Sequence, residues 1–337
     1  MRNTTKLFGI IAIVVVIGLS FASCGDNGGG GGGGLTAGLY RGELPNLIAE
    51  DRVDTVPAND VAAAVAHVNA NPGTFTLLVG APVTHDGDAW TLAADVHLTV
   101  AGTGGRQTIT RTGTGNLFNI NDANRSLTLG NNITLAGNAG NTLPLVNVAA
   151  GGSLTMNARA EITRNTVSTG NSGGGVNVTG EDSTFTMNGG EIFGNTITGA
   201  TSAGGVRVAD GALFVMHPGA VIRDNTAAGN NSGGGVAMVT STSIFRMLGG
   251  EIRGNNATGA GTTGGGVRIT VGTFQVVNGV IYGTGANAND GVTYNALLIA
   301  AGSTATLGTM VGGNFTPGAV TLSSTDNTVR VVNGVRQ

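Results

Sequence analysis

The sequence predicts an all-β protein, a right-handed single-stranded parallel β-helix, because short motifs recur along it at a fixed period. Four Ile-x-x-Asn motifs follow one another at intervals of 30 residues, beginning at Ile162, Ile192, Ile222 and Ile252. Each motif is followed by a loop of about ten Gly, Ala, Thr, Ser and Asn residues, and then by Gly-Gly-Val. A fixed period of this size is typical of a solenoid, in which each repeat buries its apolar face against its neighbours.

Alternating apolar residues define the strands that we expect in each repeat. One repeat contains Val176 and Val178, then Phe185 and Met187, then Ile192, and the neighbouring repeats have similar residues at the same positions. Residues two apart point to the same face of a strand, so each pattern gives a strand with one buried face. Gly-containing corners separate the second strand from the third. We therefore expect three strands per coil, about seven coils and right-handed crossovers.

A short helix is expected before the strands, within residues 59–72. Asn59-Asp60 is a helix start signal, the valines at 61, 65 and 68 fall on one helical face, and Asn71-Pro72-Gly73 ends the helix. Such a helix would cap the open N-terminal end of a β-helix that spans residues 73–337. The alternative is a helix that packs on a side face.

The first residues resemble a bacterial lipoprotein signal. Arg2 and Lys6 precede an apolar segment, Leu7 to Leu19, which is short for a membrane span, and Phe21-Ala22-Ser23-Cys24 then resembles a lipobox. We expect a signal peptide at 1–23 and lipidation at Cys24; the alternative is an ordinary secretory leader with an incidental cysteine. Residues 24–58 would form a tether and linker, since Gly28 to Gly34 is an unbroken glycine run. The expected location is the outer membrane or the cell surface, with a periplasm-facing placement as the alternative.

Composition excludes several classes of function. The 61 glycines lack a triplet period, which excludes collagen, and the periodic 40% apolar content argues against disorder. The formal net charge of −3 becomes −5 without Arg2 and Lys6, so we expect no nucleic-acid partner. The single cysteine excludes an internal disulfide. We interpret the cluster from His85 to Asp88 as a polar turn and expect no metal site and no cofactor.

A column of asparagines is the sharpest structural signature. The expected ladder consists of Asn138, Asn165, Asn195, Asn225 and Asn255. Side-chain amides stacked at one corner can bond to their copies above and below and to the turn backbone. We interpret this column as structural, because a catalytic residue need not recur on every coil.

The Gly-Gly-Val and Ile-x-x-Asn motifs resemble the Gly-Gly-Ala-[Ile/Leu/Val] and Phe-x-x-Asn repeats of polymorphic outer-membrane proteins and related autotransporter adhesins. The pattern is also similar to the pectin-lyase-like superfamily of right-handed β-helices. The resemblance covers roughly residues 110 to 300 and departs from the repeats in having Ile for Phe. It implies surface display and adhesion.

Two functional hypotheses follow. The first is a structural, adhesive or ligand-binding surface protein without enzymatic activity, anchored to the membrane by its lipid. Its loops 166–175, 196–205, 226–235 and 256–266, which we call the loop ridge, would bind a host or cell-surface protein or glycan. The alternative is a polysaccharide-active lyase or glycoside hydrolase, because Glu161, Glu191 and Glu251 share an outward column that Val221 interrupts. We interpret that column as a solvated surface feature.

Overall fold

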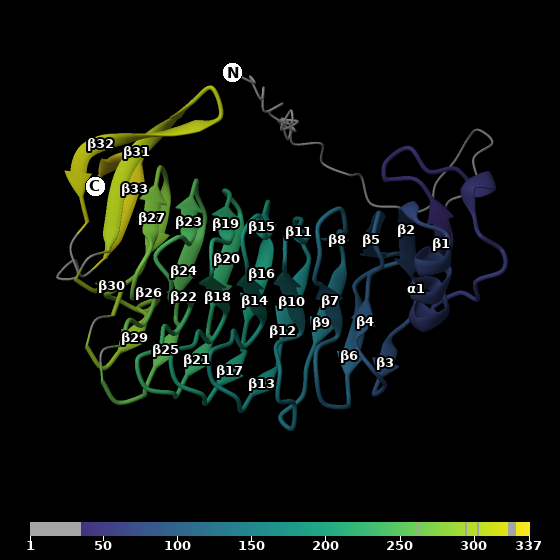
Figure 1. Ribbon diagram of the computed structural model, residues 1–337, viewed down its shortest axis with the longest axis horizontal. Helices are drawn as coiled ribbons and strands as arrows, with labels where there is room; N and C mark the ends of the chain where they lie inside the picture. Colours follow the sequence, from purple (N-terminus) through teal and green to yellow (C-terminus); the bar gives the residue numbers. More distant parts are fainter. Residues whose placement is uncertain (1–34, 262, 294, 302, 323–327) are drawn as a thin grey trace, which may run out of the picture.

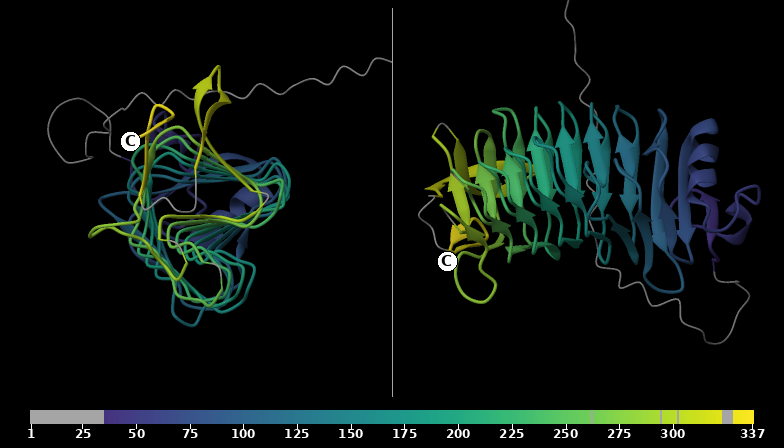
Figure 2. Two further views of the ribbon diagram at one scale, coloured as in Figure 1. Left: turned by 90° about the vertical axis from the view of Figure 1, so that its left-hand side faces the viewer. Right: turned by 90° about the horizontal axis from the view of Figure 1, so that it is seen from below.

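The computed structural model describes residues 35–337 except 262, 294, 302 and 323–327, and it shows a parallel β-solenoid of about seven turns (Figure 1). The expected signal peptide, Cys24 and the glycine run lie outside the described residues. Viewed along the solenoid axis, successive coils superpose on a common outline (Figure 2). The predicted all-β parallel solenoid with one helix is confirmed.

Four sheets run along the solenoid, and we number them in the order in which one coil passes through them. Sheet 1 contains β4 (Trp90–Thr91), β7 (Phe118–Ile120), β10 (Val146–Ala149), β14 (Val176–Thr179), β18 (Val206–Ala209), β22 (Val236–Met238), β26 (Val267–Ile269) and β30 (Leu297–Ile299). Sheet 2 contains β1 (Gly38–Arg41), β2 (Gly73–Val79), β5 (Val96–Gly102), β8 (Ser126–Leu129), β11 (Ser153–Met156), β15 (Thr184–Met187), β19 (Leu213–Met216), β23 (Ile244–Met247), β27 (Thr273–Val276), β31 (Thr304–Val311) and β32 (Asn314–Thr321).

The other two sheets complete each coil. Sheet 3 contains β3 (Val83–His85), β6 (Gln107–Arg111), β9 (Ile133–Ala136), β12 (Glu161–Thr163), β16 (Gly190–Phe193), β20 (Ala220–Arg223), β24 (Glu251–Arg253), β28 (Gly279–Ile281), β33 (Val329–Val332) and β34 (Val335–Arg336). Sheet 4 contains β13 (Thr166–Val167), β17 (Thr196–Ile197), β21 (Thr226–Ala227), β25 (Asn256–Ala257) and β29 (Asp290–Gly291). The three strands predicted for each coil therefore lie in sheets 1 to 3, and the loop ridge contributes a fourth.

Parallel pairing keeps equivalent residues of successive coils in register. Val176 pairs with Val206 in sheet 1, Phe185 with Phe214 in sheet 2, and Ile192 with Ile222 in sheet 3. All of these side chains are buried in one continuous core. Rings of the second column stack, with centroids 4.9 Å apart for Phe185 and Phe214 and 4.7 Å apart for Phe214 and Phe245. The stacking distance equals the spacing of neighbouring strands, so one repeating side chain fills one column of the core.

Close backbone contact between coils explains the Gly-Gly-Val motif. A Cβ atom added to Gly174 would lie 2.1 Å from the carbonyl oxygen of Gly204, and one added to Gly204 would lie 2.3 Å from the oxygen of Gly234. Real Cβ atoms do not approach that closely, so glycine is needed where the loop ridge rejoins sheet 1. The high glycine content is therefore part of the packing.

The helix α1 (Val61–Ala70) closes the N-terminal end of the solenoid, as predicted (Figure 2). Its N-cap is Asp60, whose carboxylate accepts the backbone N–H of Ala63 at 2.8 Å. Val61, Val65 and Val68 are buried in the main core, so the helix covers the first coil and does not lie on a side face. No helix in the described part of the chain is long and apolar enough to cross a membrane.

Residues 35–58 are more structured than the linker expected from the sequence. Strand β1 pairs antiparallel with β2, and its Leu39 and Tyr40 are buried. A short 3-10 helix, η1 (Ala49–Asp51), follows, and the backbone N–H of Val53 then bonds to the carbonyl of Leu39 at 2.8 Å. The folded body therefore begins before the helix. The expectation missed β1 because the strand is short and does not repeat.

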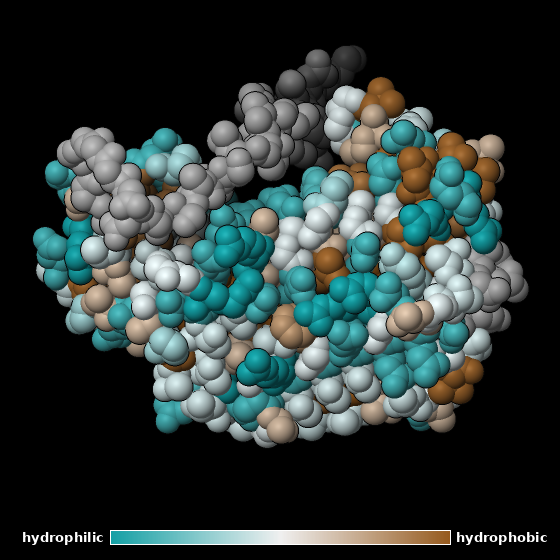
Figure 3. All heavy atoms as spheres, turned by 180° about the vertical axis from the view of Figure 1, so that it is seen from behind, coloured by the Kyte–Doolittle hydropathy of each residue, from teal (hydrophilic) through white to brown (hydrophobic). Residues whose placement is uncertain are grey.

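The C-terminal end is closed by antiparallel strands. β33 pairs antiparallel with β28, and β31 and β32 form a hairpin that projects from the solenoid (Figures 1 and 2). Apolar residues gather on the surface at this end (Figure 3), where Val311, Val320, Val332 and Val335 are exposed. Strand β33 thereby covers the edge of sheet 3 that the last parallel strand, β28, would otherwise leave unpaired.

The phenylalanine stack gives a test of core packing. Phe214→Ala should destabilise the fold by roughly 3–5 kcal/mol, because the ring is fully buried between two neighbours and its loss leaves a cavity. Coil energetics depend on nearest neighbours, so the loss of hydrogen-exchange protection should centre on residues 176–255 and not on α1. Chemical unfolding with exchange mass spectrometry measures both effects.

Val215→Ala is the matched control, because this neighbouring side chain points outward and is only partly buried. It should change stability by about 1 kcal/mol or less. Equal effects of the two substitutions would contradict the stacked core.

Candidate functional site

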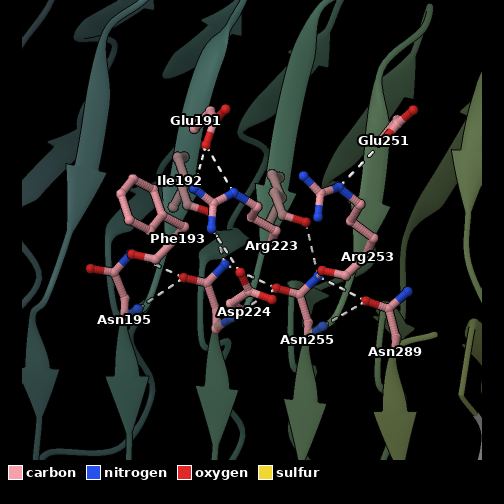
Figure 4. Close-up of polar contacts among 12 residues, drawn as sticks. Glu191, Ile192, Phe193, Asn195, Arg223, Asp224, Glu251, Arg253, Asn255 and Asn289 are labelled. Carbon is pink, nitrogen blue, oxygen red and sulfur yellow. Dashed lines mark hydrogen bonds and ion pairs between the residues drawn. The ribbon is translucent and has the colours of Figure 1, made fainter. Parts of the chain in front are cut away.

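The asparagine ladder is the most regular polar feature of the described residues. Asn195, Asn225 and Asn255 are completely buried, and each lies two residues after the last residue of the third strand of its coil. Figure 4 shows Asn195 and Asn255 at these corners. The residue before each has a positive φ, at Gly194, Asp224 and Gly254. This left-handed residue ends the strand and turns the chain, so that the next side chain enters the interior.

Each buried amide joins three coils. The Nδ2 of Asn225 donates to the carbonyl oxygen of Ile192 in the preceding coil and to Oδ1 of Asn255 in the following coil, both at 2.9 Å. Its Oδ1 accepts the backbone N–H of Asn195 at 3.1 Å and the Nδ2 of Asn195 at 3.0 Å. The side chain thus satisfies backbone groups that the corner leaves unpaired, as buried polar groups require.

The ends of the ladder differ from the prediction. Asn138 is only partly buried and bonds to the carbonyls of Arg111 and Gly113, so it lies outside the buried ladder. Asn141 takes that place and donates to Oδ1 of Asn165 at 2.7 Å. At the other end Asn289 continues the ladder and accepts from Nδ2 of Asn255 at 2.8 Å.

Insertions explain both differences. The Ile-x-x-Asn spacing places Asn138 three residues after Leu135, but a longer corner in that coil delays the buried amide to Asn141. Asn289 follows Ile281 by eight residues instead of three, so the fixed spacing could not locate it. In the sequence, only the recurrence of an asparagine after each third strand could have pointed to Asn141 and Asn289.

The predicted carboxylate column is present, and each of its members contacts an arginine. Glu161 lies beside Glu191 in the register of sheet 3, and Val221 separates Glu191 from Glu251. Arg106 lies 2.8 Å from Glu161. Arg223 lies 2.6 Å from Glu191, and Arg253 lies 3.3 Å from Glu251 (Figure 4).

Arg223 is the centre of this charged surface. Burial lowers the pKa of Arg223, but hydrogen bonds to Asp224 and Glu191 outweigh that effect and raise its pKa above the ordinary value. Its guanidinium also lies 4.1 Å from the ring centroid of Phe193. Carboxylates held in this way are positioned by ion pairing, which gives partly exposed groups a modest stabilisation. Sequence reasoning missed Arg106, because it lies 55 residues before its partner.

The loop ridge is more ordered than a row of polar loops. Val167, Ile197 and Ala227 form a separate buried cluster inside it. Ser202 and Ser232 are buried, and the backbone N–H of Ser202 donates to Oγ of Ser232 at 3.3 Å. The inner half of the ridge is therefore a second, smaller core.

Exposed tips form the outer half of the ridge, at Gly170, Ala200, Asn230 and Ala260. Backbone bonds join successive tips, for example from the N–H of Thr201 to the carbonyl of Asn230 at 2.9 Å. No charged residue occurs in the four loops. The ridge therefore presents an uncharged row of small side chains and peptide groups that can donate and accept hydrogen bonds.

The His85 turn has the contacts of a structural corner. The His85 ring stacks on Trp90 at 4.1 Å, and its Nε2 lies 2.7 Å from the carbonyl of Asp88. Arg111 is buried beneath the turn and donates to the carbonyl of Gly87. Burial lowers the pKa of Arg111, and Asp86 and Asp88 partly offset this. Within the described residues, no three His, Cys, Asp or Glu side chains lie close enough together to hold a metal ion.

Fold and site together define a parallel β-solenoid with a buried asparagine ladder and an uncharged loop ridge. Comparison with protein-family models, curated protein sequences and solved structures finds no match to this chain. The resemblance to outer-membrane repeats and to the pectin-lyase-like superfamily therefore depends on the motifs alone.

The ladder predicts that substitution of Asn195, which has no exposed surface, lowers the stability of the fold. Asn195→Ala should cost about 1–3 kcal/mol, because it removes the acceptor of the buried backbone N–H of Asn165 and one donor to the carbonyl of Ile162. Asn230→Ala at an exposed tip should change stability by about 0.5 kcal/mol or less. Denaturant unfolding of both variants measures the difference, and an unaltered midpoint for Asn195→Ala would mean that water reaches the ladder.

Proposed function

We propose that this chain is a lipid-anchored bacterial surface protein that uses the loop ridge to attach to a protein or glycan on another surface. The observation that carries the proposal is the ridge itself, which aligns four uncharged tips along one side of a rigid body. A row of equivalent tips gives repeated weak contacts to an extended partner, and several such contacts acting together produce strong attachment. Loops held by a rigid scaffold are where such folds commonly carry binding.

The anchor is supported by the sequence around Cys24 and by the glycine run that follows it. A lipid on the first residue of the mature chain, followed by a flexible segment, would hold the solenoid away from the membrane. The expected orientation is outward, with the ridge free to meet another surface.

The carboxylate column supports the polysaccharide-cleaving alternative less well. A glycosidase needs one carboxyl group that is protonated and one that is free to act as a base or nucleophile. Glu161 and Glu191 instead share their oxygens with Arg106, Thr134 and Arg223. We therefore retain the attachment role as the proposed function.

An experiment on cells that express the protein tests its exposure at the surface and its membrane anchor. Cells expressing the parent chain should expose it to added protease and should retain it in the membrane fraction. Cys24→Ser should release it from that fraction, because lipidation needs the thiol. Firm membrane binding of the Cys24→Ser protein would contradict the anchor.

The same cells test the ridge. Replacing the exposed Ala200 and Asn230 together by Arg should reduce attachment to a panel of host-cell and glycan-coated surfaces, since bulky charges would separate the ridge from its partner. Ala158→Arg, at an exposed corner between sheets 2 and 3, is the matched control and should attach like the parent. Equal attachment by all three proteins would contradict a role for the ridge.

A further inference from the structure

Large hydrophobic side chains that reach the surface gather at the two ends of the solenoid. Among the described residues, all but one of those that are exposed lie before α1 or after β28, namely Leu44, Ile48, Val292, Val311, Val320, Val332 and Val335. The exception is Leu143, in the loop between β9 and β10, away from both ends. Single exposed apolar residues are normal, whereas residues gathered in one region mark an interaction surface.

The N-terminal end combines exposed apolar side chains with an acidic surface (Figure 1). Leu44 is 41% exposed and Ile48 is 56% exposed. Glu43 and Glu50, near them in the sequence, are exposed and belong to none of the ion pairs in the described part of the chain. Residues 41–60 contain five acidic side chains and two arginines, which leaves a net charge of −3: Glu43, Glu50, Asp51, Asp54, Asp60, Arg41 and Arg52.

The helix that caps this end has an unusually apolar outer face. While the valines of α1 face the core, Ala62, Ala66 and Ala70 lie four residues apart and form an exposed stripe on the opposite side. The helix contains no Asp, Glu, Lys or Arg. Terminal caps of solenoids ordinarily turn a polar face to water, and a helix that is apolar on all sides is typical of one covered on both sides. The cap is therefore suited to contact with a further surface.

The C-terminal end offers a complementary surface on β33 and β34. In the described part of the chain, β34 is the outermost strand of sheet 3. Val332 and Val335 face each other across this hairpin and are 47% and 60% exposed. Arg330 and Arg336 lie on the same two strands, and both are exposed. The only acidic residue from 304 to 337 is Asp326, which lies outside the described residues, so the side chains of this end carry a net positive charge.

We propose that the N-terminal end of one copy of this chain binds the C-terminal end of the next, so that solenoids join head to tail. In this arrangement an acidic apolar surface meets a basic apolar one, whereas contact between two identical ends would place like charges opposite each other. The two ends face opposite ways along the axis, so repeated contacts of this kind extend into a linear filament. The proposal does not rest on the attachment role of the loop ridge.

Sedimentation velocity on the full chain measures the association. The protein is kept in a mild detergent with micelles in excess, so that two copies do not share a micelle. The apparent mass of the parent should rise at least about twofold between roughly 1 and 100 μM, the concentration range in which weak protein contacts form. A parent that sediments as a single copy over the whole range would overturn the proposal.

Substitutions at either end should abolish the rise in mass. Ile48→Arg and, independently, Ala66→Arg place a cation opposite the arginines of the next copy, and Val335→Asp places an anion opposite the acidic end. Leu143→Arg is the matched control, because it replaces an exposed large hydrophobic residue away from both ends, and it should associate like the parent. All four side chains are exposed, so the melting temperatures should stay close to that of the parent. Association of the end variants like the parent, or its loss in the control, would overturn the proposal.

An equimolar mixture of Ile48→Arg and Val335→Asp distinguishes head-to-tail contact from a symmetric dimer. The first variant retains the C-terminal end of the parent and the second retains its N-terminal end, so the mixture should associate although neither variant does alone. A symmetric dimer through the C-terminal ends would persist in Ile48→Arg alone, and one through the N-terminal ends would persist in Val335→Asp alone. Either result, or a mixture that remains unassociated, would overturn the proposal.

Discussion

Register between successive coils is the constraint on which the rest of this structure depends. Parallel strands in neighbouring coils lie about 4.8 Å apart, so whatever occupies one position in a coil is in direct contact with its equivalent in the next. In the central coils phenylalanine stacks on phenylalanine, and a glycine backbone passes a glycine backbone. In the central coils each buried amide bonds to the amide of the next coil. The 30-residue repeat of the sequence is the consequence of this contact.

The same constraint arranges the surface into columns. On sheet 3 it sets carboxylates beside carboxylates, and the arginines that contact them reduce the repulsion. On sheet 1 it sets amides beside guanidinium groups, which bond to one another from coil to coil. On the loop ridge it aligns four tips that carry no charge. Function in such a molecule is therefore expected from a line of equivalent groups more than from a single cluster of unlike residues, and the loop ridge has that form.

The prediction from sequence succeeded where residues repeat and failed where they do not. The buried columns at Val176, Phe185 and Ile192 were visible because each recurs in register. Strand β1 and the strands β32, β33 and β34 pair antiparallel, outside the repeat, so no period marks them. Sheet 4 was hidden because its two-residue strands lie within Gly- and Thr-rich loops. The ladder was located correctly in its centre, but Asn138 was assigned in place of Asn141 because fixed spacing ignores the longer corner before Asn141.

A double-mutant cycle within the ladder tests most directly whether contact between equivalent residues holds the coils together. Asn195 and Asn225 are in contact, whereas Asn165 and Asn255 lie three coils apart, a separation of about 14 Å. Alanine substitutions in the adjacent pair should be non-additive by about 0.5–3 kcal/mol in the free energy of unfolding, and those in the distant pair should add within about 0.5 kcal/mol. Strict additivity in the adjacent pair would contradict the account, because it would show that each coil satisfies its asparagine without the help of the next.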